Sequence, residues 1–136
     1  MIIADTNVVC ELFRPEPDVR VIEWLEANPD VGTTAITVGE LWVGIENLPD
    51  GRRKSGLASV ADELFNEFFG DITDYDARAA RTYGQIVAER RRQGRPISQG
   101  DAQIAAICLA AGATLATRNV KDFVGIELVV LDPWEM

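Results

Sequence analysis

The chain has 136 residues, the size of one ordinary globular domain and enough to bury a core without disulfide or metal cross-links. Its composition, 47% hydrophobic and 26% charged, excludes a disordered chain and predicts a single folded, soluble domain over residues 1–136. The net charge of −9 excludes a protein that coats nucleic acid nonspecifically, because such binding needs many Lys and Arg side chains against phosphates.

Short apolar runs alternate with longer helical stretches along the chain, a pattern typical of an α/β fold with a parallel sheet. We expect short strands at residues 2–4, 31–35, 71–73, 113–117 and 127–131. We expect helices at residues 6–13, 17–28, 37–48, 56–69, 76–92 and 98–111. The predicted fold class is therefore α/β, with a short central parallel sheet flanked by helices.

No segment predicts export or membrane insertion. The first apolar residues run directly into Asp5, which leaves no room for a secretory leader. The longest nearly apolar stretch, residues 104–116, is shorter than the roughly 20 residues that span a bilayer. Cys10 and Cys108 are far apart and lie among apolar neighbours, so we expect two buried, unpaired thiols. These features predict a cytoplasmic protein that makes no membrane contact.

The absence of histidine narrows the possible chemistry. It excludes the Ser-His-Asp triad, the Cys-His pair, a histidine acid–base ribonuclease and histidine-ligated zinc. Since two separated cysteines are the only soft ligands, any metal site must be built from oxygen, which favours Mg²⁺ or Mn²⁺. Carboxylates are the remaining candidates for catalysis.

Asp5 follows the first predicted strand, at the edge of a parallel sheet where ligands bind. An Asp between a strand and a helix also serves as a helix cap, so its position alone leaves both interpretations open. Glu40 and Asp101 are similarly ambiguous, because Thr37-x-x-Glu40 and Ser98-x-x-Asp101 both fit the capping-box pattern.

Helical spacing favours a chemical role for Asp101. It places Asp101 on the face that carries Ile104, Ala105 and Cys108, which must turn toward the sheet. Acids gathered at such an edge raise one another's pKa unless a cation lies among them. A divalent metal ion would remove that repulsion.

Two clusters of basic residues contrast with the acidic net charge of the chain. One consists of Arg78, Arg81, Arg90, Arg91, Arg92 and Arg95, and the other of Arg52, Arg53 and Lys54. Each is open to two interpretations, a patch that grips phosphates or a solvated helix face.

Several segments of the chain resemble the PIN domain and, within that family, the VapC-like toxins of the FitB-like branch. They are Ile2-Ile3-Ala4-Asp5-Thr6-Asn7, Ile36-Thr37-Val38-Gly39-Glu40-Leu41, Asp101-Ala102-Gln103-Ile104-Ala105-Ala106, Leu115-Ala116-Thr117-Arg118-Asn119-Val120-Lys121-Asp122-Phe123 and Asp132-Pro133-Trp134. The resemblance spans almost the whole chain, and the order and spacing of the segments make it specific. It implies a PIN-like single domain that cleaves structured RNA with Mg²⁺ as the toxin of a type II toxin–antitoxin system. It also implies a homodimer, held in check in a higher oligomer by a cognate antitoxin with a DNA-binding domain.

The resemblance also implies a set of site residues. The catalytic acids and metal ligands are Asp5, Glu40 and Asp101, which bind Mg²⁺ or Mn²⁺, and the supporting polar residues are Asn7 and Thr117. Many family members carry an acid where this chain has Asn119, so we expect Asn119 to complete the catalytic site through its amide oxygen. Asp122, three residues further on, is the second candidate for that position.

This site predicts phosphodiester hydrolysis with one or two Mg²⁺ ions, leaving 5′-phosphate and 3′-hydroxyl ends. Two alternatives stay open. A phosphotransfer module of the receiver or haloacid-dehalogenase kind also has an Asp after its first strand, but Asp5-Thr6-Asn7 lacks a nearby second acid. The other alternative is a catalytically inactive PIN-like binding module. The absence of an acid at position 119 suggests this alternative.

Overall fold

The computed structural model describes all 136 residues. Its strands are β1 (Ile2–Ala4), β2 (Thr33–Thr34), β3 (Ile72–Thr73), β4 (Thr114–Ala116) and β5 (Val130–Leu131). Its α-helices are α1 (Thr6–Glu11), α2 (Val19–Ala27), α3 (Ala35–Glu46), α4 (Arg52–Glu63), α5 (Ala77–Arg92) and α6 (Gln99–Ala111). A π-helical turn, η1 (Leu64–Phe68), continues α4, and two 3₁₀ turns are η2 (Val120–Phe123) and η3 (Pro133–Glu135).

All the strand pairings are parallel, as the sequence predicts. β4 lies between β1 and β5, and β2 pairs with β3. A parallel bridge between Ile3 and Gly32 joins the two groups, so the strands follow one another in the order β3, β2, β1, β4, β5. Because they are parallel, their carboxyl ends meet at one edge.

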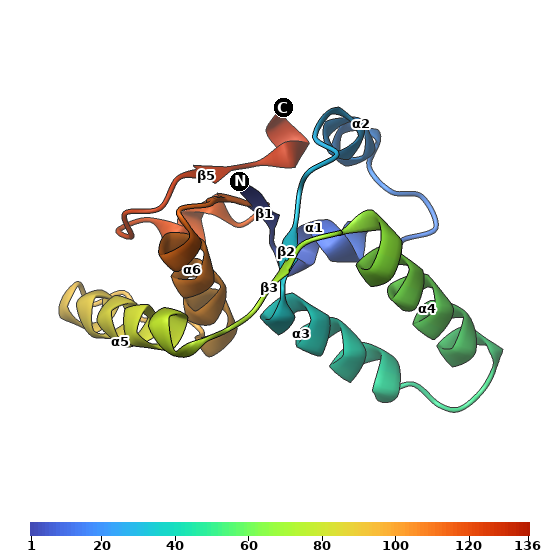
Figure 1. Ribbon diagram of the computed structural model, residues 1–136, viewed down its shortest axis with the longest axis horizontal. Coiled ribbons are helices and arrows are strands. Elements are labelled where there is room, and N and C mark those ends of the chain that lie inside the picture. The colour runs from blue at the N-terminus through green and yellow to red at the C-terminus, as the bar shows by residue number, and fades with distance from the viewer.

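Helices cover both faces of this sheet (Figure 1). Ala4 and Ala116 belong to a core shared with α1, α2, α3 and α4. The preceding residues, Ile3 and Leu115, belong to the other core, shared with α5 and α6. This alternation is the period-two geometry of strands, and it explains why β1 is apolar at every position.

Gly32 permits a close approach between β2 and the residue before β3. A Cβ atom at Gly32 would lie 2.7 Å from the backbone oxygen of Asp71, at the point where Thr33 N donates to that same oxygen. A side chain at this position would therefore push β2 and β3 apart.

Two helix starts differ from the predictions. α3 begins at Ala35 rather than residue 37, because Thr34 is the cap whose hydroxyl accepts from Thr37 N. Consequently Thr37 lies inside the helix and does not form a capping box with Glu40. α4 begins at Arg52, so the basic cluster at 52–54 forms its first turn.

Cys10 is exposed, contrary to the prediction, because Val8 and Val9 take the core-facing positions of α1. Cys108 is buried, and both cysteines are unpaired. No helix is long and apolar enough to cross a bilayer.

Candidate active site

Asp5 lies at the carboxyl end of β1 and is buried, with 3% of its surface exposed. Its Oδ1 accepts from Thr6 N at 2.8 Å, so the residue does cap α1. Its Oδ2 accepts from Thr117 Oγ1 at 2.7 Å and from Asn7 Nδ2 at 3.3 Å. The capping role therefore uses one oxygen and leaves the other held by polar side chains.

Burial raises the pKa of Asp5 above its ordinary value, although the hydrogen bonds from Thr117 and Thr6 oppose the shift. The negative charges of Asp101 and Glu40 raise this pKa further. Two acids from distant parts of the sequence therefore act on Asp5 here.

Thr117 connects the end of β4 to Asp5. Besides donating to Asp5, its buried hydroxyl accepts from Asn7 Nδ2 at 3.0 Å and from Asn119 N at 3.1 Å. Asn7 Oδ1 in turn accepts from Arg118 N at 3.2 Å. The structure thus brings together the two polar residues predicted from the sequence, Asn7 and Thr117, around one carboxylate.

Glu40 reaches the site from the second turn of α3. Thr6 Oγ1 lies 3.1 Å from Glu40 Oε1, to which it donates, and 3.0 Å from Thr37 Oγ1. Both carboxylate oxygens of Glu40 face the start of α6, since a Cβ atom at Gly100 would lie 3.6 Å from each. Sequence reasoning missed Thr6, although its place beside Asp5 was the available signal.

Asp101 lies in the first turn of α6, where its backbone N donates to the Ser98 hydroxyl at 3.3 Å. Ser98 is therefore the cap, as predicted. Burial raises the pKa of the Asp101 carboxyl, a hydrogen bond with Ser98 lowers it, and the charge of Asp122 raises it. Asp101 is half-buried, which leaves it accessible from outside.

Asn119 and Asp122 occupy different surroundings. The backbone N of Asn119 donates to Thr117 Oγ1, but Asn119 is an exposed residue. Asp122, in contrast, lines a cavity of about 200 Å³ together with Ser98 and Asp101. Of the two, Asp122 is the one whose charge acts on an acid of the site.

The residues fit a divalent ion in chemistry, because the donors at this edge are carboxylate and hydroxyl oxygens. Burial is the main cause of the raised pKa of Asp5 and of Asp101. The repulsion from neighbouring acids that adds to it is of the kind that a cation relieves. No three acidic or cysteine side chains lie close enough together to hold an ion as they stand. Binding would therefore require the exposed carboxylates, above all Glu40, to move inward.

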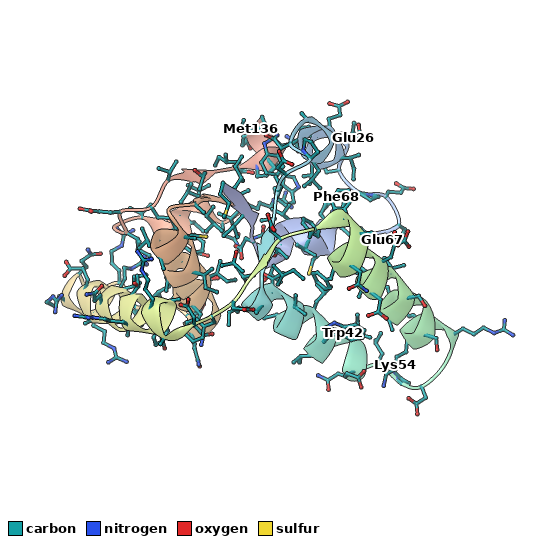
Figure 2. All side chains as sticks on the ribbon, viewed as in Figure 1. Glu26, Trp42, Lys54, Glu67, Phe68 and Met136 are labelled. Atoms are coloured by element: carbon teal, nitrogen blue, oxygen red, sulfur yellow. The ribbon has the colours of Figure 1, made fainter.

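The second basic cluster lies away from this edge. Lys54, labelled in Figure 2 and part of the first turn of α4, has its Nζ 3.4 Å from Asp50 Oδ1 and 3.8 Å from Glu46 Oε2. Its charge is thus engaged within the α3–α4 hairpin. In the first cluster, all the arginines except Arg90 are exposed.

Comparison with known families and proteins gives consistent matches. The family described as PIN domain matches residues 2–125. The chain is similar to VapC ribonuclease Y4jK of Sinorhizobium fredii, with 34% identity over 138 residues that cover 99% of each protein. It is also similar to the tRNA(fMet)-specific endonuclease VapC of Shigella flexneri, with 39% identity over 131 residues, 96% of this chain and 95% of the relative.

A third relative is the toxin FitB of Neisseria gonorrhoeae, with 36% identity over 137 residues, 98% of this chain and 99% of the relative. The solved structure of FitAcB from Neisseria gonorrhoeae matches with a TM-score of 0.91, 35% identity and full coverage of both chains. FitAB bound to the IR36 DNA fragment matches with the same TM-score of 0.91 at 34% identity, covering 100% of this chain and 97% of the other.

Proposed function

The chain belongs to the PIN-domain family, and from that premise we propose that it is a divalent-metal-dependent endoribonuclease that acts as the toxin of a type II toxin–antitoxin pair. The observation that carries the proposal is the position of Asp5 at the carboxyl end of β1, held by Thr117 and Asn7, with Glu40 and Asp101 near enough for their charges to act on it. Relatives that cover nearly the whole chain are named ribonuclease, endonuclease and toxin, which supports the same reaction here.

Asp5 and Asp101 would hold the metal ion, for which we propose Mg²⁺ with Mn²⁺ as a substitute. When bound, the ion supplies Lewis-acid polarisation of the scissile phosphate and greater acidity of the attacking water. Thr117 and Asn7 fix the Oδ2 atom of Asp5. They would therefore keep the Asp5 carboxylate oriented toward the metal ion during the reaction.

Glu40 has the geometry to orient the attacking water. Its carboxylate is exposed and is held at one oxygen by Thr6 Oγ1, so the other oxygen is available as an acceptor. In-line attack by water at the phosphate would leave 5′-phosphate and 3′-hydroxyl ends. Asp122 would support the site through its charge beside Asp101. Asn119, whose backbone N donates to Thr117, would contribute through its amide oxygen if its side chain turns toward the ion.

The substrate we propose is structured RNA, because one relative is named a tRNA(fMet)-specific endonuclease. The proposed partner is a small antitoxin with a DNA-binding domain, since FitAB was solved as a complex with DNA. We further propose a homodimer that joins the antitoxin in a higher oligomer in the cytoplasm. A catalytically inactive binding module has less support, because the three principal acids are all present.

The test is cleavage of labelled tRNA by the purified full chain, with Mg²⁺, without added metal and with a chelator. We expect cleavage only with the metal, producing 5′-phosphorylated fragments. Asp101→Asn should abolish cleavage while its circular dichroism spectrum stays that of the wild type. Equal cleavage in the presence of chelator, or full activity in Asp101→Asn, would contradict metal-dependent RNA hydrolysis at this site.

A further inference from the structure

Arg90 is a buried cation in the last part of α5. It is 5% exposed, its Nε donates to Arg95 O at 2.7 Å, and its Nη1 donates to Asp122 O and Val124 O, each at 3.0 Å. None of the chain's five ion pairs includes it. Removing a guanidinium from water opposes folding, and neutral carbonyls offset this less than a carboxylate would. Its bonds therefore call for an explanation other than general stability.

Those bonds join two segments that each carry an acid of the site. Asp122 O and Val124 O belong to η2 and the residue after it, beyond the end of β4. Arg95 O belongs to the turn that leads from α5 into α6 and Asp101. Arg90 also lines the cavity of about 200 Å³ that Asp101 and Asp122 share. It thus ties together the two sides of that cavity.

A second contact also connects the end of α5 to the segment that follows η2. Gln93 Nε2 donates to Gly125 O at 3.2 Å. Gly125 has a φ of +90°, and a Cβ atom on it would lie 2.5 Å from Gln93 Oε1. Arg90 and Gln93 therefore hold the 122–125 segment at three carbonyls, and the absence of a side chain at Gly125 leaves room for the Gln93 amide.

We infer that Arg90 is a positioning residue for the acidic site: by fastening the 122–124 segment to the α5–α6 turn, it sets how the Asp122 carboxylate stands relative to Asp101. The inference rests on the proposed function, since this placement matters only if the acids act on a divalent ion. Arg90 donates to backbone carbonyls and to no carboxylate of the site. We therefore expect its effect on metal binding to pass through the placement of Asp122.

The experiment measures Mn²⁺ affinity of the full-length chain by isothermal titration calorimetry, in wild type and in Arg90→Met, which keeps bulk but removes the donors. We expect about 10-fold weaker binding, the loss typical when a residue supporting a metal ligand is removed. Arg91→Met is the matched control, because Arg91 is the exposed neighbour on the same helix. It should bind Mn²⁺ with wild-type affinity.

A double-mutant cycle distinguishes positioning from a general loss of structure. If Arg90 acts through Asp122, Arg90→Met combined with Asp122→Asn should bind Mn²⁺ no more weakly than Asp122→Asn alone. Arg90→Lys, which keeps the charge and some of the donors, should restore part of the affinity lost in Arg90→Met. Wild-type affinity in Arg90→Met, or losses that multiply in the double variant, would overturn the inference.

Gly125→Ala provides a second approach if Arg90→Met does not fold. The new methyl group pushes against Gln93 and strains a φ of +90°, so it should weaken Mn²⁺ binding in the same direction. Wild-type affinity in Gly125→Ala would then count against the tie. No Mn²⁺ binding by the wild-type chain would instead overturn the proposed function, which separates the two failures.

Discussion

The hydroxyl of Thr117 donates a 2.7 Å hydrogen bond to the buried Oδ2 atom of Asp5, across 112 positions of sequence. The two residues follow neighbouring parallel strands, β1 and β4, whose register pairs Ala4 with Ala116. This register alone places the residues after the strands side by side. Thr117 also accepts from Asn7 and Asn119, so one hydroxyl organises much of the site.

Thr117→Val tests this organising role, because valine keeps the shape and removes the hydroxyl. We expect a loss of about 1–3 kcal/mol in the free energy of unfolding, since buried polar partners are left unsatisfied. The pKa of Asp5 should rise further, because the bond from Thr117 lowers it. Urea unfolding measures the free energy of unfolding, and calorimetric titration measures the Mn²⁺ affinity of the site. Thr117→Ser is the control that retains the hydroxyl, and an equal loss in both variants would assign the effect to packing.

Asp101→Asn should change how stability depends on pH. The pKa of Asp101 is raised in the folded protein, so between its unfolded value near 3.8 and the raised value the folded state binds more protons than the unfolded state. Stability of the metal-free protein therefore falls as pH rises through that window. Asp101→Asn removes this fall, so we expect it to be more stable than wild type at neutral pH. Thermal unfolding of the wild type and of Asp101→Asn from pH 3.5 to 7, in the presence of a chelator, measures the pH dependence and the stability at neutral pH.

Asp18→Asn is a control of opposite sign. Hydrogen bonds from Arg20 lower the pKa of Asp18 to about 2, so its contribution is present above the unfolded value near 3.8 and lost as pH falls toward 2. Asn also caps helices well, which leaves the charge as the main change. Asp18→Asn should therefore lower stability at neutral pH. If Asp101→Asn also lowered stability at neutral pH, the Asp101 interpretation would be wrong.

The strand ends were the most predictable part of the site. Asp5 and Thr117 follow short apolar runs, and parallel strands bring their carboxyl ends together, so the sequence pattern was sufficient. The start of α3 was not predictable, because Thr34 and Thr37 both suit a helix cap. The choice depends on the pairing of β2 with β3, which keeps Thr34 extended.

Arg90 was misassigned although the signal was present. It was counted with the surface arginines of α5, yet it is spaced by four from Ile86 and by eleven from Ala79, the buried residues of that helix. Helical periodicity thus places it on the face packed against α6. The contact of Glu40 with Thr6 is different, since it depends on how α3 meets α1, which no local pattern fixes.

Asp122→Asn and Asn119→Asp together test which residue completes the acidic set. Asp122 lines the cavity beside Asp101, whereas Asn119 is an exposed residue. We therefore expect Asp122→Asn to weaken Mn²⁺ binding by about 10-fold and to slow RNA cleavage. Asn119→Asp should tighten binding much less, unless its side chain turns toward the ion. Calorimetric titration and cleavage rates measure both, and unchanged affinity in Asp122→Asn would make Asp122 a structural residue.

Arg118→Met should weaken RNA binding without changing metal affinity. Arg118 directly follows Thr117, its backbone N donates to Asn7, and its guanidinium lies 5.1 Å from the centre of the Trp134 ring. Because Arg118 directly follows Thr117, we expect its guanidinium to contact a phosphate of the bound substrate and offset the repulsion of that phosphate from the acids.

Binding of labelled tRNA at several salt concentrations, in an Asp101→Asn background that prevents cleavage, measures this contribution. Loss of one phosphate contact should lower the affinity and reduce the slope of log affinity against log salt by about 1. Arg53→Met makes the same charge change at an exposed position in the first turn of α4, so it serves as the matched control. Equal losses in the two variants would mean that overall charge, rather than a contact of Arg118, governs RNA binding.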